Sequence, residues 1–180
     1  MGKEALVLEE RTIGVVPRVR LNTSLGHRDY AILVTNLRSI FVLEFVDRMR
    51  LALYGGLLVA VGVKALEGGR MTYDYAAVYP SQLAKLKKSI VVHHDLIERL
   101  RFKSGLLAGS MKIAYQMPSG SRMRFTFELV PPKSFKRKLA MKGKGGWGTS
   151  REYLMQVQDI YKKALLLPFC RRAKVAWQDC

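Results

Sequence analysis

Two segments of alternating apolar and polar residues, 111–115 and 122–130, constrain the fold of this chain more than any other feature. Residues 117–121 (MPSGS) separate them and are typical of a turn. The apolar set of the second segment is Met123, Phe125, Phe127 and Leu129. The polar set is Arg122, Arg124, Thr126 and Glu128. Because successive side chains of a strand point to opposite faces, the pattern predicts an antiparallel hairpin with one buried face and one mainly basic face.

The rest of the chain also reads as strands first and a helix last. Residues 5–21, 30–35 and 39–45 are rich in β-branched and aromatic residues, and residues 26–29 are expected to form a turn. Residues 81–88 predict a short helix. At the C-terminal end, Thr149 and Glu152 have the spacing of a capping box, and Pro168 is expected to stop the helix that follows. Its apolar stripe is Leu154, Val157, Ile160, Tyr161, Ala164 and Leu165.

An uncharged run interrupts the β pattern at residues 51–63 (LALYGGLLVAVGV). A transmembrane helix needs about 20 apolar residues, so this run is too short to span a bilayer. Three interpretations remain open: a buried or self-associating helix, an interfacial membrane contact, and part of the core. The candidate membrane or self-association residues are Leu51, Leu53, Tyr54, Leu57, Leu58 and Val61. Self-association through this run would make the protein a homo-oligomer.

Residues 31–44 (AILVTNLRSIFVLE) resemble a hairpin found in prokaryotic pleckstrin-homology-like (PH-like) and GRAM-like domains. The matching positions are Val34, Thr35, Asn36 and Arg38. This resemblance implies a mainly β (α+β) fold: a barrel of two antiparallel sheets capped by a C-terminal helix, with a helical apolar insert. We expect one domain over residues 1–167, an insert at 46–88 and a tail at 168–180. The resemblance also implies a binding module without catalytic residues.

Charge is concentrated in the second half of the chain. The protein has 31 Lys and Arg against 14 Asp and Glu, a net charge of +17. From residue 99 to residue 151 there are thirteen basic residues and one acid, Glu128. Such a distribution favours a surface that binds phosphates. The candidate anion-binding residues are Arg122, Arg124, Lys133, Lys136, Arg137, Lys138, Lys142 and Lys144.

Aromatic residues accompany these basic residues at Phe135, Trp147 and Trp177. The combination is typical of nucleic-acid binding, where rings stack on bases, and of anionic membranes, where Trp favours the interface. Both partners remain open. The apolar run favours a peripheral membrane or scaffold protein, with an RNA- or DNA-binding protein, for example in a ribonucleoprotein, as the alternative.

Motifs for catalysis, metals or cofactors are not evident in the sequence. The pair His93 and His94, next to Asp95, is expected to be an exposed pair at a strand end. The glycine-rich residues 142–148 (KGKGGWG) lack the P-loop pattern, so we expect either phosphate capture without hydrolysis or a solvated loop. Cys170 and Cys180 have no zinc-site spacing. The N-terminus has no apolar signal region, and we expect a cytoplasmic protein that associates with membranes.

Overall fold

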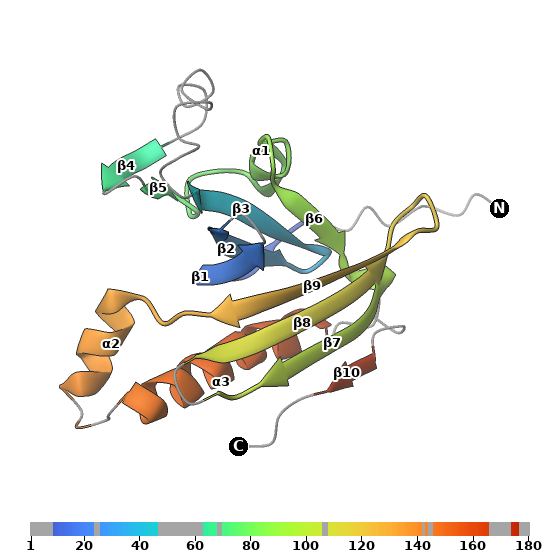
Figure 1. Ribbon diagram of the computed structural model, residues 1–180. Coiled ribbons are helices and arrows are strands. Elements are labelled where there is room, and N and C mark those ends of the chain that lie inside the picture. Colours follow the sequence, from blue (N-terminus) through green and yellow to red (C-terminus); the bar gives the residue numbers. More distant parts are fainter. Residues whose placement is uncertain are drawn as a thin grey trace.

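The computed structural model describes residues 9–23, 26–46, 63–67, 70–105, 108–141, 143, 146–165 and 174–176. The strands of one half are β1 (Thr12–Thr23), β2 (Gly26–Thr35), β3 (Arg38–Val46) and β6 (Ile90–His93). Those of the other half are β7 (Ile97–Lys103), β8 (Gly109–Gln116), β9 (Arg122–Leu129) and β10 (Lys174–Ala176). Together these strands form one sheet in the order β10-β7-β8-β9-β1-β2-β3-β6 (Figure 1). The expected mainly β class is therefore confirmed.

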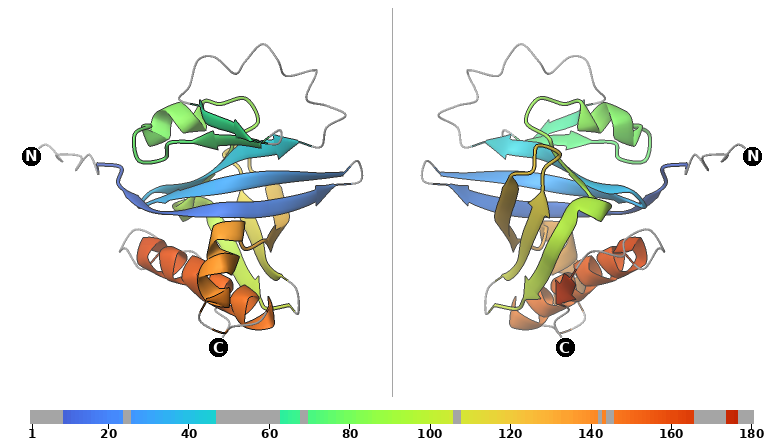
Figure 2. Two further views of the ribbon diagram at one scale, coloured as in Figure 1. Left: turned by 90° about the vertical axis from the view of Figure 1, so that its left-hand side faces the viewer. Right: turned by 90° about the vertical axis from the view of Figure 1, so that its right-hand side faces the viewer.

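The sheet bends where β1 passes from one half to the other. β1 pairs with β2 along most of its length but with β9 only at Val19–Leu21. A register shift between Val16 and Val19 accommodates Pro17, which cannot donate to a regular ladder. Figure 2 shows the β1–β2 strands crossing the β7–β9 strands at a steep angle. Hydrogen bonds thus join all these strands in one sheet rather than in the two expected, and the closed barrel remains a prediction.

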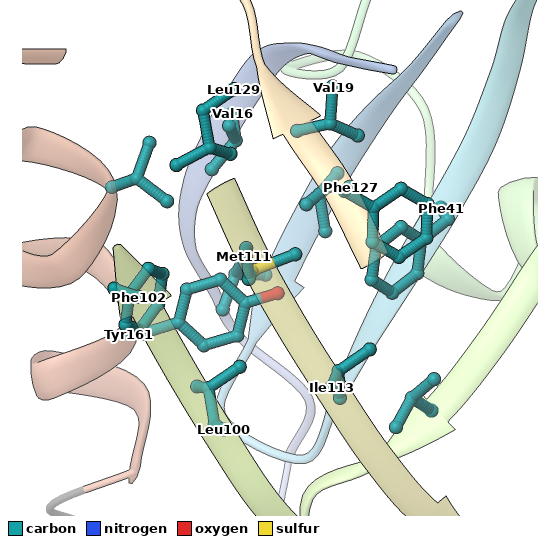
Figure 3. Close-up of a cluster of buried hydrophobic side chains, with 14 of the residues drawn as sticks. Val16, Val19, Phe41, Leu100, Phe102, Met111, Ile113, Phe127, Leu129 and Tyr161 are labelled. Atoms are coloured by element: carbon teal, nitrogen blue, oxygen red, sulfur yellow. The ribbon is translucent and has the colours of Figure 1, made fainter. Parts of the chain in front are cut away.

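The C-terminal helix α3 (Gly146–Leu165) packs on the inner face of the bent sheet (Figure 1). Its buried side chains, including Tyr161, share one apolar core with the inner faces of both halves. Phe102 of β7 lies 5.8 Å from Tyr161, and Phe41 of β3 stacks on Phe127 of β9 at 4.7 Å, both measured between ring centroids (Figure 3). The alternation predicted for β9 is confirmed at Phe127 and Leu129, which are fully buried, and in part at Phe125, which is half-buried. It fails at Met123, which is 36% exposed because it lies outside the apolar core.

A smaller core lies on the opposite face of β2 and β3. Leu33, Ile40 and Val42 pack there against β5 (Arg70–Tyr73) and the short helix α1 (Pro80–Ala84). β5 forms a hairpin with β4 (Val63–Glu67). Strand β2 is therefore buried on both faces, which explains its continuous apolar sequence. These elements cover the outer face of β2 and β3, whereas the outer face of β7–β9 carries exposed side chains such as Arg99, Lys112 and Arg124.

The residues behind the PH-like resemblance build a tight hairpin and anchor the preceding segment. Thr35 Oγ1 accepts hydrogen bonds from the backbone N–H groups of Leu37 (3.2 Å) and Arg38 (3.0 Å). The Arg38 guanidinium donates two hydrogen bonds of 2.8 Å to the Glu10 carboxylate. Asn36 Oδ1 accepts from the Arg11 backbone N–H at 2.8 Å. These residues therefore have structural roles.

Several sequence-based boundaries were wrong. Residues 26–29 continue β2 instead of forming a turn. Residues 133–140 form a helix, α2 (Lys133–Ala140), that was not expected. Helix α3 begins at Gly146, three residues before the proposed cap at Thr149. Residues 174–176 of the expected tail pair in parallel with β7. Within the expected helical insert the described residues form β4, β5 and α1, and residues 51–62 lie outside the described part.

Candidate anion-binding groove

The outer face of β7–β9 carries exposed basic side chains on all three strands. Strand alternation places them there, because Leu100, Phe102, Met111 and Phe127 occupy the buried face. The exposed basic residues are Arg99, Arg101, Lys103, Lys112, Arg122 and Arg124. Only Arg122 and Arg124 were predicted from the sequence. The structure therefore adds four basic residues, from two further strands, to that pair.

The strand register arranges part of this face in two rows. In the first, the Ala114 row, Ala114 lies between Arg99 on β7 and Arg124 on β9. In the second, the Lys112 row, Lys112 lies directly opposite both Arg101 and Thr126. Cross-strand neighbours have Cβ atoms about 5 Å apart, so the paired charges of Arg101 and Lys112 repel one another.

A concave groove of about 680 Å³ follows this face. We call it the β7–β9 groove. Its basic lining consists of Arg99, Arg101, Lys112, Arg122 and Arg124, and its small or polar lining includes Ala114, Gln116 and Thr126. Two acids, Asp95 and Glu98, also line it. Because basic residues outnumber acidic ones, the groove attracts anions.

The carboxylates that the structure describes leave most of this positive charge without an ion-pair partner. Glu98 accepts a hydrogen bond of 3.0 Å from Arg122, which is the ion pair within the groove. Among the described residues, no ion pair involves Arg99, Arg101, Lys112 or Arg124.

Carboxylates of the N-terminal half have partners of their own. Asp29 lies 2.8 Å from Arg20 and 3.4 Å from Arg18, and Glu10 binds Arg38. Burial raises the pKa of Glu10, but hydrogen bonds from Arg38 and Thr35 outweigh it, so the pKa lies below its ordinary value. Hydrogen bonding to Asp29 likewise raises the pKa of Arg20. These acids therefore do not neutralise the groove.

The other predicted anion-binding residues lie elsewhere. Arg124 is five residues from the end of β9, roughly 17 Å of extended chain, and α2 follows that end (Figure 1). The exposed basic residues of α2 are Lys133, Lys136, Arg137 and Lys138. The structure does not bring them to Arg122 and Arg124, so the predicted anion-binding residues that the structure describes fall into two groups. Lys142 and Lys144 lie outside the described residues.

The predicted aromatic contacts are not at the groove in the described part of the chain. Phe135 of α2 is half-buried, and its ring lies 5.2 Å from that of Tyr153 on α3. The side chain of Trp147 and all of Trp177 lie outside the described residues. So do the candidate membrane or self-association residues Leu51, Leu53, Tyr54, Leu57, Leu58 and Val61.

His93 and His94 do not form the expected exposed pair. His93 is exposed, whereas His94 is buried in the short helix η2 (His94–Leu96), with Nε2 3.0 Å from Ser39 Oγ. Burial, followed by the nearby His93, lowers the pKa of His94 to about 4. No cluster of three or more His, Cys, Asp or Glu residues suited to a metal occurs in the described part. No described helix has the length and hydrophobicity to cross a bilayer.

Comparisons with known proteins give no family. No protein-family model matches the chain, and no curated protein sequence does. Among solved structures, the chain is similar to the hSac2 domain from human phosphoinositide phosphatase Sac2, with a TM-score of 0.49 and 11% sequence identity. The match covers 98% of this chain and 83% of that chain. A likeness this weak carries no argument about function.

Proposed function

We propose that the protein is a non-catalytic module that docks on an anionic, phosphate-rich surface, with a membrane as the leading partner. The observation that carries this proposal is the β7–β9 groove, whose residues Arg99, Arg101, Lys112 and Arg124 have no described carboxylate partner. Guanidinium groups stay protonated at all physiological pH values, which suits them to holding anions and not to acid–base catalysis.

Exposed apolar side chains at the turn where β8 and β9 meet favour a membrane. Met117 and Met123 flank the turn between β8 and β9 and are 37% and 36% exposed. Met123 belongs to the strand face opposite Arg122 and Arg124, and neither methionine lines the groove. An apolar tip beside basic residues suits insertion at a lipid interface. Single-stranded nucleic acid is usually held by stacking on aromatic rings, and the described groove residues include only Phe125, which is half-buried.

The proposal extends to the fold and the setting of the protein. We take the chain to be a PH-like domain, with β4, β5 and α1 as an insert. The order of β1–β3, β6, the β7–β9 meander and the helix α3 supports this interpretation, although α2 precedes α3 and β10 follows it. We place it in the cytoplasm at the membrane surface, with residues 51–63 as the candidate site of self-association.

Flotation with anionic liposomes at low salt tests the proposal. The groove variant Arg99→Gln/Arg101→Gln/Lys112→Gln/Arg124→Gln removes four charges. At about 1 kcal/mol per basic residue near the surface, its partitioning should fall by up to about a thousandfold. The control Lys133→Gln/Lys136→Gln/Arg137→Gln/Lys138→Gln removes the same charge from α2 and should retain most binding.

Two results would overturn this proposal. One is an intact protein that stays in the soluble fraction with anionic liposomes at low salt. The other is that the α2 variant no longer floats with the liposomes while the groove variant floats as well as the wild type. Binding to duplex or single-stranded nucleic acid, with steep salt dependence and no flotation, would instead establish nucleic acid as the partner.

A further inference from the structure

The two rows of the β7–β9 groove suggest a more specific ligand than a uniformly charged surface. We propose that the groove binds two phosphate monoester groups carried by one molecule, one group at each row. This inference rests on the proposed function and adds to it the chemical class of the ligand.

The charge of each row matches a phosphate monoester. The Ala114 row has Arg99 and Arg124, and the Lys112 row has Arg101 and Lys112. A monoester carries about −1.5 to −2 charges near neutral pH, and a phosphodiester carries one. Two cations per row therefore suit a monoester better than the diester of an ordinary phospholipid or of nucleic acid. Arginine adds bidentate hydrogen bonding to phosphate oxygens.

The spacing of the rows suits two groups on one small molecule. Residues 112 and 114 are two positions apart on β8, so the rows lie about 6.7 Å apart. Arg99 and Arg124 are two strands apart, roughly 10 Å between Cα atoms, and the small side chain of Ala114 leaves space between them. Thr126, at the end of the Lys112 row, offers a hydroxyl donor. The groove volume of about 680 Å³ is within the range of small-molecule sites.

The experiment compares vesicles of equal surface charge. One set contains phosphatidylserine and the other phosphatidylinositol bisphosphate, and the soluble inositol trisphosphate headgroup is titrated separately by calorimetry. We expect the bisphosphate vesicles to bind about tenfold or more tightly than the phosphatidylserine vesicles. The soluble headgroup should bind to the protein without vesicles.

Variants of single rows test the assignment. Arg99→Gln/Arg124→Gln and Arg101→Gln/Lys112→Gln should each abolish the preference for the bisphosphate. The control Lys133→Gln/Lys136→Gln removes the same charge from α2 and should retain it. Thermal unfolding of each variant verifies that the fold is intact.

The outcomes separate this inference from the proposed function. Equal binding to both vesicle types, without binding of the soluble headgroup, overturns the two-phosphate inference and leaves membrane docking intact. Binding of the soluble headgroup without binding to any vesicle supports the inference with a soluble ligand and overturns membrane docking. Preference unchanged in both row variants overturns the assignment to this groove. Failure to bind any of these probes overturns both proposals.

Discussion

Substitution of Arg101 by glutamate should stabilise the fold while weakening anion binding. Arg101 on β7 lies directly opposite Lys112 on β8, and both side chains are exposed. Like charges at opposed cross-strand positions destabilise a sheet, whereas opposite charges stabilise it. The substitution Arg101→Glu replaces a pair of like charges on the two strands by a pair of opposite charges.

The expected gain follows from the size of cross-strand interactions. A directly opposed charge pair contributes about 0.2–1 kcal/mol, and removal of the repulsion adds an effect of similar size. Because solvent screens both exposed groups, we expect a total of about 0.5–1 kcal/mol in the free energy of unfolding. For a chain of this length that is roughly 1–4 °C in Tm. Binding to anionic vesicles should weaken by roughly thirtyfold, since two units of charge change at about 1 kcal/mol each.

Urea denaturation and vesicle binding, measured on the same samples, test both effects. Arg124→Glu is the matched control, because it makes the same charge change opposite the neutral Ala114. It should weaken binding equally and shift the free energy of unfolding by less than about 0.5 kcal/mol. The gain from Arg101→Glu should disappear in 1 M salt, where the screening length is about 3 Å. If Arg101→Glu is no more stable than the wild type at low salt, the row arrangement is refuted.

Three other substitutions test the surrounding structure. Glu98→Gln frees Arg122 from its 3.0 Å partner and removes a negative charge, so affinity for anionic vesicles should rise a few-fold; unchanged or weaker binding would contradict the role of Glu98. Arg38→Ala should lower the free energy of unfolding by about 2 kcal/mol at pH 7, because it removes the partner of Glu10. Measured by urea denaturation, this loss should become smaller as the pH falls through the lowered pKa of Glu10, since the carboxylate is then protonated. The pKa of His94 is about 4 in the folded protein, below the ordinary 6.5. As the pH falls, the unfolded chain therefore takes up the proton first. The free energy of unfolding should decrease from about pH 6.5 to about pH 4, by up to about 3 kcal/mol. His94→Asn should remove that contribution to urea denaturation across the same window, and an unchanged pH dependence would show that other groups cause it.

The fold could be predicted where one face of a strand is buried and the other is exposed to solvent. The alternation from Arg122 to Leu129 predicted the β8–β9 hairpin, because Phe125, Phe127 and Leu129 pack in or against the apolar core. Helix α2 escaped prediction because its basic residues match a solvated loop, and only the half-buried Phe135 and the buried Leu139 hold it against the rest. The start of α3 was misplaced because the Gly146–Leu165 helix begins in a glycine-rich segment of low helix propensity.

The regularity of the alternation also explains why only part of the basic lining of the groove could be predicted. Arg122 and Arg124 follow a regular alternation, whereas a register shift between Ile97 and Arg99 disturbs the period of β7. Ile97 and Leu100 are both buried although they are three positions apart, a spacing that also fits a helix. The basic residues of β7 were therefore not assigned to a strand face. The alternation from Leu100 to Lys103 is the signal that identifies them.

Amide chemical-shift mapping by NMR with anionic bicelles identifies the surface that receives the anionic partner. We expect the largest changes on the strands of the β7–β9 groove, at Arg99, Lys112, Arg124 and their neighbours, and little change on α2. Changes centred on α2, or spread evenly over the described surface, would contradict the claim that this groove receives the anionic partner.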